Sequence, residues 1–88
     1  MAWQVEYSPR AATAMRKLDR QIARRIFDSI ERLATLDDPT ASCKALTGNY
    51  SGFWRLRVGD YRIILDIRRE QVVIVALDLG HRSKIYVD

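Results

Sequence analysis

The sequence predicts an α+β domain in which a helical hairpin packs on one face of a small, largely antiparallel sheet. Residues 2–7 alternate between apolar and polar, which is typical of a half-buried strand. Apolar residues then recur at helical spacing up to residue 36, and the alternation of strands returns after residue 53. The predicted order is strand, helix, helix and three strands. At 88 residues the chain has the length of one domain, residues 1–88.

Two capping signals start the predicted helices. Ser8 can cap the first helix, and Pro9 suits the first helical position. Asp19 can cap the second helix, which we expect to end near residues 36–39. The apolar stripes of the two helices are Ala11, Ala12, Met15 and Leu18, followed by Ile22, Ile26, Ile30 and Leu33.

The second half of the chain is predicted to be a loop followed by a sheet. Residues 39–49 are small and polar, which indicates a loop of a length that is often functional. Strands are expected over residues 53–58, 61–67 and 72–77, separated by a tight turn and a charged turn. The last of these strands is apolar on both faces, which is typical of a central strand.

Composition narrows the class of partner. The net charge is +4, from 15 Lys and Arg against 11 Asp and Glu, and arginine dominates. This balance indicates a polyanion such as nucleic acid, although a solvated surface with a mild basic bias remains open. Cys43 is the only cysteine, so no internal disulfide can form, and we interpret it as a small apolar side chain. The chain has no signal-peptide pattern and no apolar run of about 20 residues, so a cytoplasmic protein without a membrane contact is expected.

The strand over residues 53–58 carries the first candidate site. Alternation places Arg55 and Arg57 on one face and the apolar residues of the strand on the other. Arg62 follows on the partner strand, just after the tight turn. Like charges so close together repel one another, which favours a bound phosphate among them. An ordinary exposed strand face with acidic neighbours, Asp60 and Asp66, remains the alternative.

The C-terminal stretch carries the second candidate site, with His81, Arg82 and Tyr86. Each of these residues could equally be structural. The sequence contains no evident metal-ligand cluster, cofactor motif, paired carboxylates or Ser-His-Asp set. An enzyme built from these residues would therefore work without metal or cofactor, mainly by cationic stabilisation of charge, which suits phosphoryl transfer.

Two blocks resemble the RelE toxins of the RelE/ParE toxin–antitoxin superfamily. Residues 46–64, LTGNYSGFWRLRVGDYRII, are similar to the family pattern L-x-G-x(3)-G-x-[WY]-R-[LI]-R-x-G-[DN]-[YW]-R. Residues 80–86, GHRSKIY, resemble the closing H-R-x(2)-[VI]-Y. The resemblance runs in order over essentially all 88 residues and implies the RelE-like fold, in agreement with the fold predicted above.

The resemblance also implies a function. RelE toxins belong to type II toxin–antitoxin systems and cleave messenger RNA in the ribosomal A site. The 2′-hydroxyl attacks the adjacent phosphate and leaves a 2′,3′-cyclic phosphate, which stops translation. The implied partners are a cognate RelB-like antitoxin, the ribosome and its messenger, and operator DNA only through the antitoxin complex.

The resemblance assigns roles to the candidate residues. Arg55 and Arg57 fall where well-known RelE toxins carry lysines, and Arg62 matches the arginine after the turn. Arg82 matches the tail arginine, His81 precedes it as in many relatives, and Tyr86 matches a tyrosine that stacks on a base. Arginine keeps its proton and is a poor general base. Proton transfer is left to Tyr86, to His81, or to the cations and the ribosome together.

Two other functions remain open. The ParE branch of the superfamily poisons DNA gyrase and cuts no RNA. A catalytically idle member would serve only as an antitoxin-binding co-repressor. The arginines of the hairpin with Arg82 and Tyr86 favour the ribonuclease.

Overall fold

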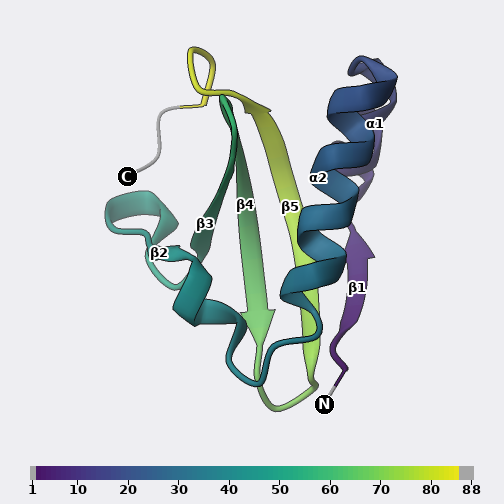
Figure 1. The fold of residues 1–88 in the computed structure, drawn as a ribbon. Helices are drawn as coiled ribbons and strands as arrows, with labels where there is room; N and C mark the ends of the chain where they lie inside the picture. Colours follow the sequence, from purple (N-terminus) through teal and green to yellow (C-terminus); the bar gives the residue numbers. More distant parts are fainter. Residues whose placement is uncertain (1, 86–88) are drawn as a thin grey trace.

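A computed structural model describes residues 2–85 and confirms the α+β fold, with both helices packed on a five-stranded sheet (Figure 1). The strand order is β1-β5-β4-β3-β2, with β1 parallel to β5 and the other neighbours antiparallel. The elements are β1 (Gln4–Tyr7), α1 (Pro9–Lys17), α2 (Arg20–Leu33), η1 (Pro39–Ser42), β2 (Lys44–Ala45), η2 (Gly48–Tyr50), β3 (Trp54–Val58), β4 (Tyr61–Arg68) and β5 (Val73–His81). The strand β5 lies inside the sheet, as its two apolar faces predict.

The predicted caps start both helices. The hydroxyl of Ser8 accepts a hydrogen bond from the backbone N–H of Ala11 at 3.1 Å and donates one to the carbonyl of Leu77 at 2.7 Å. The carboxylate of Asp19 accepts from the backbone N–H of Gln21 at 3.0 Å. Ser8 therefore both begins α1 and ties it to β5.

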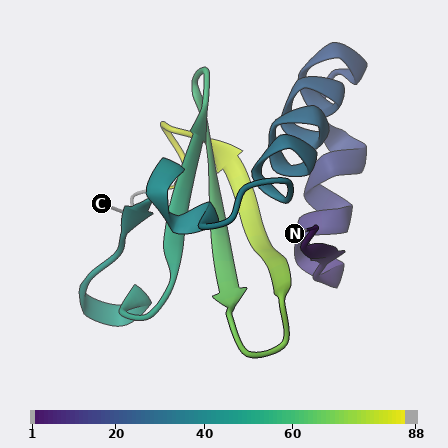
Figure 2. The same cartoon turned by 60° about the horizontal axis from the view of Figure 1, so that its bottom comes forward.

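The main core lies between the helices and one face of the sheet. Ile26 and Ile30 of α2 are fully buried against Ile63, Leu65 and Ile74 of the central strands. Figure 2 shows both helices on the same side of the sheet. The other face carries a smaller apolar cluster, which contains Leu46, Phe53, Ile64, Leu77 and Ile85.

Three boundaries differ from the sequence-based expectation. Helix α2 ends at Leu33 rather than near residues 36–39. The predicted loop over residues 39–49 contains two short 3₁₀ turns and the two-residue strand β2, which pairs with the start of β3. The last strand continues beyond Leu77 to His81. This strand contains a bulge, because Leu65 pairs with Ala76 while Ile64 pairs with Asp78, which leaves Leu77 as the extra residue.

Candidate active site

The hairpin of β3 and β4 positions the first two arginines. Leu56 and Val58 are buried under the helices. The exposed side chain of Arg57, which lies between them in the strand, therefore faces the other way. The strand register sets Arg57 directly opposite Arg62. The turn between the strands needs Gly59, which has a φ of +58°. The two guanidinium stems therefore share one face of the sheet, as the alternation predicts.

Arg82 joins these two residues at the end of the sheet. Its backbone N–H donates to the carbonyl of Asp60 at 2.8 Å, and its Nε lies 3.8 Å from the carboxylate of the same residue. A pocket of about 230 Å³ results, lined by Arg57, Gly59, Asp60, Arg62 and Arg82. Three guanidinium groups from three strands or strand ends can thus surround one phosphate.

Arg55 lies on the same face but outside this pocket. In the strand register it pairs with Lys44 of β2 on one side and with Ile64 of β4, which belongs to the second apolar cluster, on the other. The structure therefore brings Arg57, Arg62 and Arg82 together and leaves Arg55 further along the strand.

The tail packs back over the sheet beside Arg62. The Nη1 of Arg62 donates to the carbonyl of Ile85 at 3.1 Å. Gly80, which is opposite Arg62 in β5, leaves room for this tail, because a Cβ there would lie 3.0 Å from the Ile85 side chain. Arg62 therefore links the arginine pocket to the chain end. Tyr86, the next residue, lies outside the described residues.

His81 lies on the opposite face of the sheet from the three arginines. It pairs across the strands with Tyr61, and the two rings are 5.5 Å apart at 85°. Tyr61 packs against the helix-covered core. The Nδ1 of His81 accepts from the backbone N–H of Ser83 at 3.1 Å. The structure therefore does not bring His81 into the pocket.

Asp60 is the residue of the pocket that sequence reasoning did not select. Its carboxylate and carbonyl both engage Arg82, which fixes where the strand end of β5 meets the β3–β4 turn. In the sequence, Asp60 stood out only as an acidic neighbour of the arginines and as the [DN] position of the family pattern after the turn glycine.

Cys43 is poorly suited to nucleophilic chemistry. Burial, aided by the charge of Asp38, raises the pKa of its thiol to about 11, so the thiol is protonated at neutral pH. Within residues 2–85, no group of three or more His, Cys, Asp and Glu side chains could hold a metal ion. No helix in this part of the chain is long and apolar enough to cross a bilayer.

Comparison with known proteins places the chain in a family. The family described as ParE toxin of type II toxin–antitoxin system, parDE, matches residues 5–86. The chain belongs to this toxin family. The expectation of a type II toxin of the RelE/ParE superfamily is thereby confirmed. No curated protein matches the chain.

Solved RelE structures share the toxin's fold. A chain of the RelBE2 toxin–antitoxin complex from Mycobacterium tuberculosis is 24% identical, with a TM-score of 0.84 and coverage of 96% of this chain and 95% of that chain. A chain of the RelE–RelB complex from Pyrococcus horikoshii is 25% identical, with a TM-score of 0.77 and coverage of 97% and 100%. A mutant of Escherichia coli RelE in the free state is 20% identical, with a TM-score of 0.73 and coverage of 92% and 84%.

Proposed function

We propose that this toxin is a ribosome-dependent endoribonuclease that cuts messenger RNA in the A site. The observation that carries the proposal is the pocket in which Arg57, Arg62 and Arg82 converge. In an ordinary surface hairpin such a cluster lowers stability, because like charges directly opposite one another repel. A phosphodiester at this place converts that repulsion into charge-assisted hydrogen bonds.

The reaction is transfer of the phosphoryl group to a neighbouring oxygen of the same RNA strand. The 2′-oxygen forms a bond to phosphorus and loses its proton, while the bond from phosphorus to the 5′-oxygen breaks and that oxygen gains a proton. Negative charge builds on the phosphoryl oxygens as this happens, and fixed cations stabilise that charge without reorganising. Arg57 and Arg62 hold the scissile phosphate, and Arg82 stabilises charge near the leaving oxygen. Arg55 attracts the adjoining backbone from the same sheet face.

Proton transfer is the part that the arginines do not supply. An arginine guanidinium carries hydrogen-bond donors and no acceptor, so it is a poor general base. His81 faces the helices from the other side of the sheet, so we assign proton transfer to Tyr86 and to groups of the ribosome. This incomplete acid–base set is the reason to expect dependence on the ribosome, which also supplies a second wall for an open pocket.

We further propose a RelB-like antitoxin as the partner of this toxin. The RelE structures from Mycobacterium tuberculosis and Pyrococcus horikoshii are of complexes with their antitoxins. Here the side chains of Phe27 and Leu36 are exposed by 40% and 36%, respectively. A hollow of about 290 Å³ beside Leu36 is partly apolar, with Leu33 and Leu56 in its lining. These positions suit apolar anchors of an antitoxin segment. The toxin–antitoxin complex would act in the cytoplasm and would contact operator DNA through the antitoxin.

Gyrase poisoning is the second candidate function, because the family that matches residues 5–86 is the ParE family. The arginine pocket favours the ribonuclease, since a protein that cuts no RNA has no need of a phosphate site of this kind. Expression of the toxin in cells separates the two functions. A ribonuclease stops protein synthesis at once, whereas a gyrase poison leaves synthesis running and induces DNA damage.

The proposal is tested with purified toxin and a defined messenger. We expect naked messenger to stay nearly intact and to be cut within the A-site codon once programmed ribosomes are added. The Arg16→Gln variant, on the exposed face of α1, is the matched control and should cut as the wild type does. Equal cleavage with and without ribosomes, or none in either case, would overturn ribosome-dependent cleavage.

A further inference from the structure

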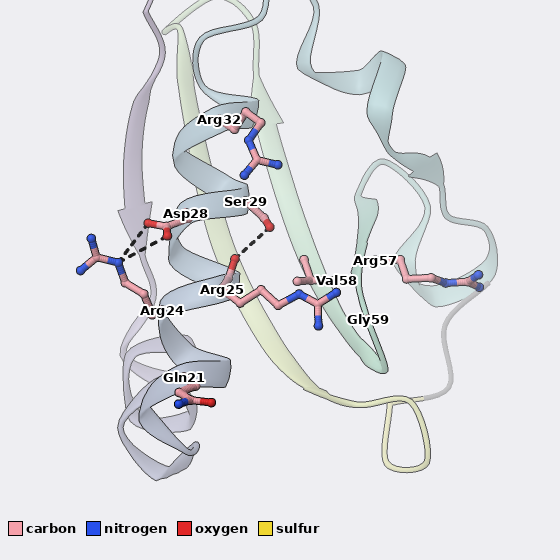
Figure 3. Close-up of a pocket in the computed structure, with 9 residues that line it drawn as sticks. All are labelled: Gln21, Arg24, Arg25, Asp28, Ser29, Arg32, Arg57, Val58 and Gly59. Atoms are coloured by element: carbon pink, nitrogen blue, oxygen red, sulfur yellow. Dashed lines mark hydrogen bonds and ion pairs between the residues drawn. The ribbon is translucent and has the colours of Figure 1, made fainter.

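A second hollow adjoins the arginine pocket, between α2 and the β3–β4 turn (Figure 3). It has a volume of about 480 Å³ and is lined mainly by polar residues of α2, with Val58 and Gly59 on the sheet side. Arg57 and Gly59 line both hollows, so the two hollows meet at the turn. We name this second hollow the α2 groove.

Two arginines of α2 dominate the α2 groove. Arg25, Ser29 and Arg32 lie at helical spacing and share one face of α2. Among residues 2–85, the guanidinium groups of Arg25 and Arg32 have no hydrogen-bond or ion-pair partner, and both side chains belong to exposed residues. The groove therefore presents two cations that have no hydrogen-bond or ion-pair partner among these residues.

The acidic residue of the groove does not cancel this charge. Asp28 pairs with Arg24 at 3.2 Å, and Figure 3 shows that pair on the side of α2 that points away from β3. Figure 3 also shows the Arg25 side chain reaching from α2 toward Val58 and Gly59. Arg24 and Asp28 also line the groove, but the Asp28 carboxylate pairs with Arg24 and forms no ion pair with Arg25 or Arg32.

Gly59 gives Arg25 its place over the turn. A Cβ on Gly59 would lie 3.2 Å from Nη1 of Arg25 and 3.5 Å from the central carbon of its guanidinium group. The bare glycine therefore lets a cation from α2 approach the hairpin at the point where the arginine pocket begins. A polyanion that leaves the pocket over this turn meets Arg25 first and Arg32 farther along the helix.

We propose that the α2 groove binds the sugar-phosphate backbone of single-stranded RNA that flanks the scissile phosphate, with Arg25 and Arg32 as phosphate contacts. This inference rests on the proposed ribonuclease function, because the flanking strand is the substrate of the adjoining pocket. RNA fits better than an acidic peptide of an antitoxin. Val58 is the only large apolar side chain in the lining, whereas a peptide that folds on binding needs several apolar anchors.

The test is binding of a 2′-O-methyl RNA oligonucleotide of about ten nucleotides, which covers a usual single-strand site and offers no 2′-hydroxyl for cleavage. Fluorescence anisotropy over a series of salt concentrations compares the wild type with the double variant Arg25→Gln/Arg32→Gln. The control variant is Arg16→Gln/Arg20→Gln, which loses the same charge at exposed positions outside the groove. Circular dichroism checks that each variant folds.

Loss of two phosphate contacts predicts that the slope of log K against log salt becomes shallower by about 1.4 in the groove variant. Its affinity at low salt should fall by about tenfold or more, while the control variant stays close to the wild type. A slope and affinity equal to those of the control would overturn the inference. So would a polyglutamate peptide whose binding depends on Arg25 and Arg32 more than RNA binding does, which would make the groove a protein site.

Cleavage on programmed ribosomes is measured on the same variants, so that the two proposals fail separately. Wild-type cleavage combined with unchanged RNA binding by the groove variant leaves the ribonuclease standing and removes the groove. A shallower slope for the groove variant, with no cleavage by the wild type, supports an RNA-binding groove and removes the ribonuclease.

Discussion

Replacement of Arg57 by glutamine should make the protein more stable and less able to bind phosphate. Arg57 faces Arg62 directly across the β3–β4 pair, and Arg82 lines the same pocket. A pair of like charges directly opposite in a sheet lowers the free energy of unfolding by about 0.2–1 kcal/mol. Arg57→Gln removes this repulsion and keeps most of the apolar stem, so the free energy of unfolding should rise by about 0.5 kcal/mol. For a domain of this size, that raises Tm by about 2–4 °C.

Phosphate should reverse the order of the two proteins. A ligand that binds only the folded state stabilises it by about 1.4 kcal/mol at ten times its Kd. The wild type, with all three guanidinium groups, should gain most of that amount, and the variant much less. Thermal unfolding is followed by circular dichroism at low salt, with added phosphate and with sodium chloride of equal ionic strength.

A second arginine supplies the matched control for this experiment. Arg24 forms an ion pair with Asp28 at 3.2 Å on α2, so Arg24→Gln removes an attraction and should leave Tm unchanged or slightly lower. A lower Tm of Arg57→Gln without phosphate would contradict the expected repulsion. Equal stabilisation of the wild type and Arg57→Gln by phosphate would contradict the phosphate site.

Three further predictions concern the core, the thiol and the proton donor. Ile30→Ala should lower the free energy of unfolding by about 2–5 kcal/mol in urea titrations, because Ile30 is 0% exposed; a loss below about 1 kcal/mol would contradict its place in the core. Alkylation of Cys43 by iodoacetamide should stay slow at pH 8 and accelerate toward pH 11, because burial raises the thiol pKa from 9.0 to about 11. Alkylation at pH 8 as fast as that of a free thiol would contradict the raised pKa. The same shift predicts that the contribution of this thiol to the free energy of unfolding is full below pH 9 and is lost as pH rises toward 11. In single-turnover cleavage, Tyr86→Phe should lose about 10²–10⁴-fold if its hydroxyl transfers the proton, and His81→Gln should not; the reverse order would move that role to His81.

Local signals predicted most of this fold. Ser8 and Asp19 begin the two helices because capping depends on only a few neighbouring residues. The alternation in β3 also placed Arg57 on the face opposite Leu56, because side-chain direction in a regular strand follows position alone. These features need no knowledge of distant contacts.

The face on which His81 lies could not be predicted in the same way. Unbroken alternation from Ile74 would place Asp78 with the core and His81 on the arginine face. The bulge at Leu77 shifts the register by one residue, so Leu79 and His81 face the helices instead. A bulge depends on the partner strand as well as on local sequence. The sequence alone therefore did not predict that His81 and the arginines lie on opposite faces of the sheet.

The pairing of Arg82 with Asp60 was hidden for a related reason. These residues are far apart in the sequence, and they meet because β5 runs on to His81 and ends beside the β3–β4 turn. The candidate arginines fall in two separate blocks of the sequence, residues 46–64 and 80–86. Strand β5 extends four residues beyond Leu77, and this extension brings the two blocks into one pocket.

We propose that the arginine pocket cuts messenger RNA by stabilising charge on a phosphate. The most direct measurement is the single-turnover cleavage rate on programmed ribosomes, with the termini of the products identified. The wild type should leave a 2′,3′-cyclic phosphate and a 5′-hydroxyl within the A-site codon, and Arg57→Gln and Arg82→Gln should each cut about 10²–10³ times more slowly. Intact messenger on ribosomes, with gyrase inhibited by the same protein, would contradict the claim.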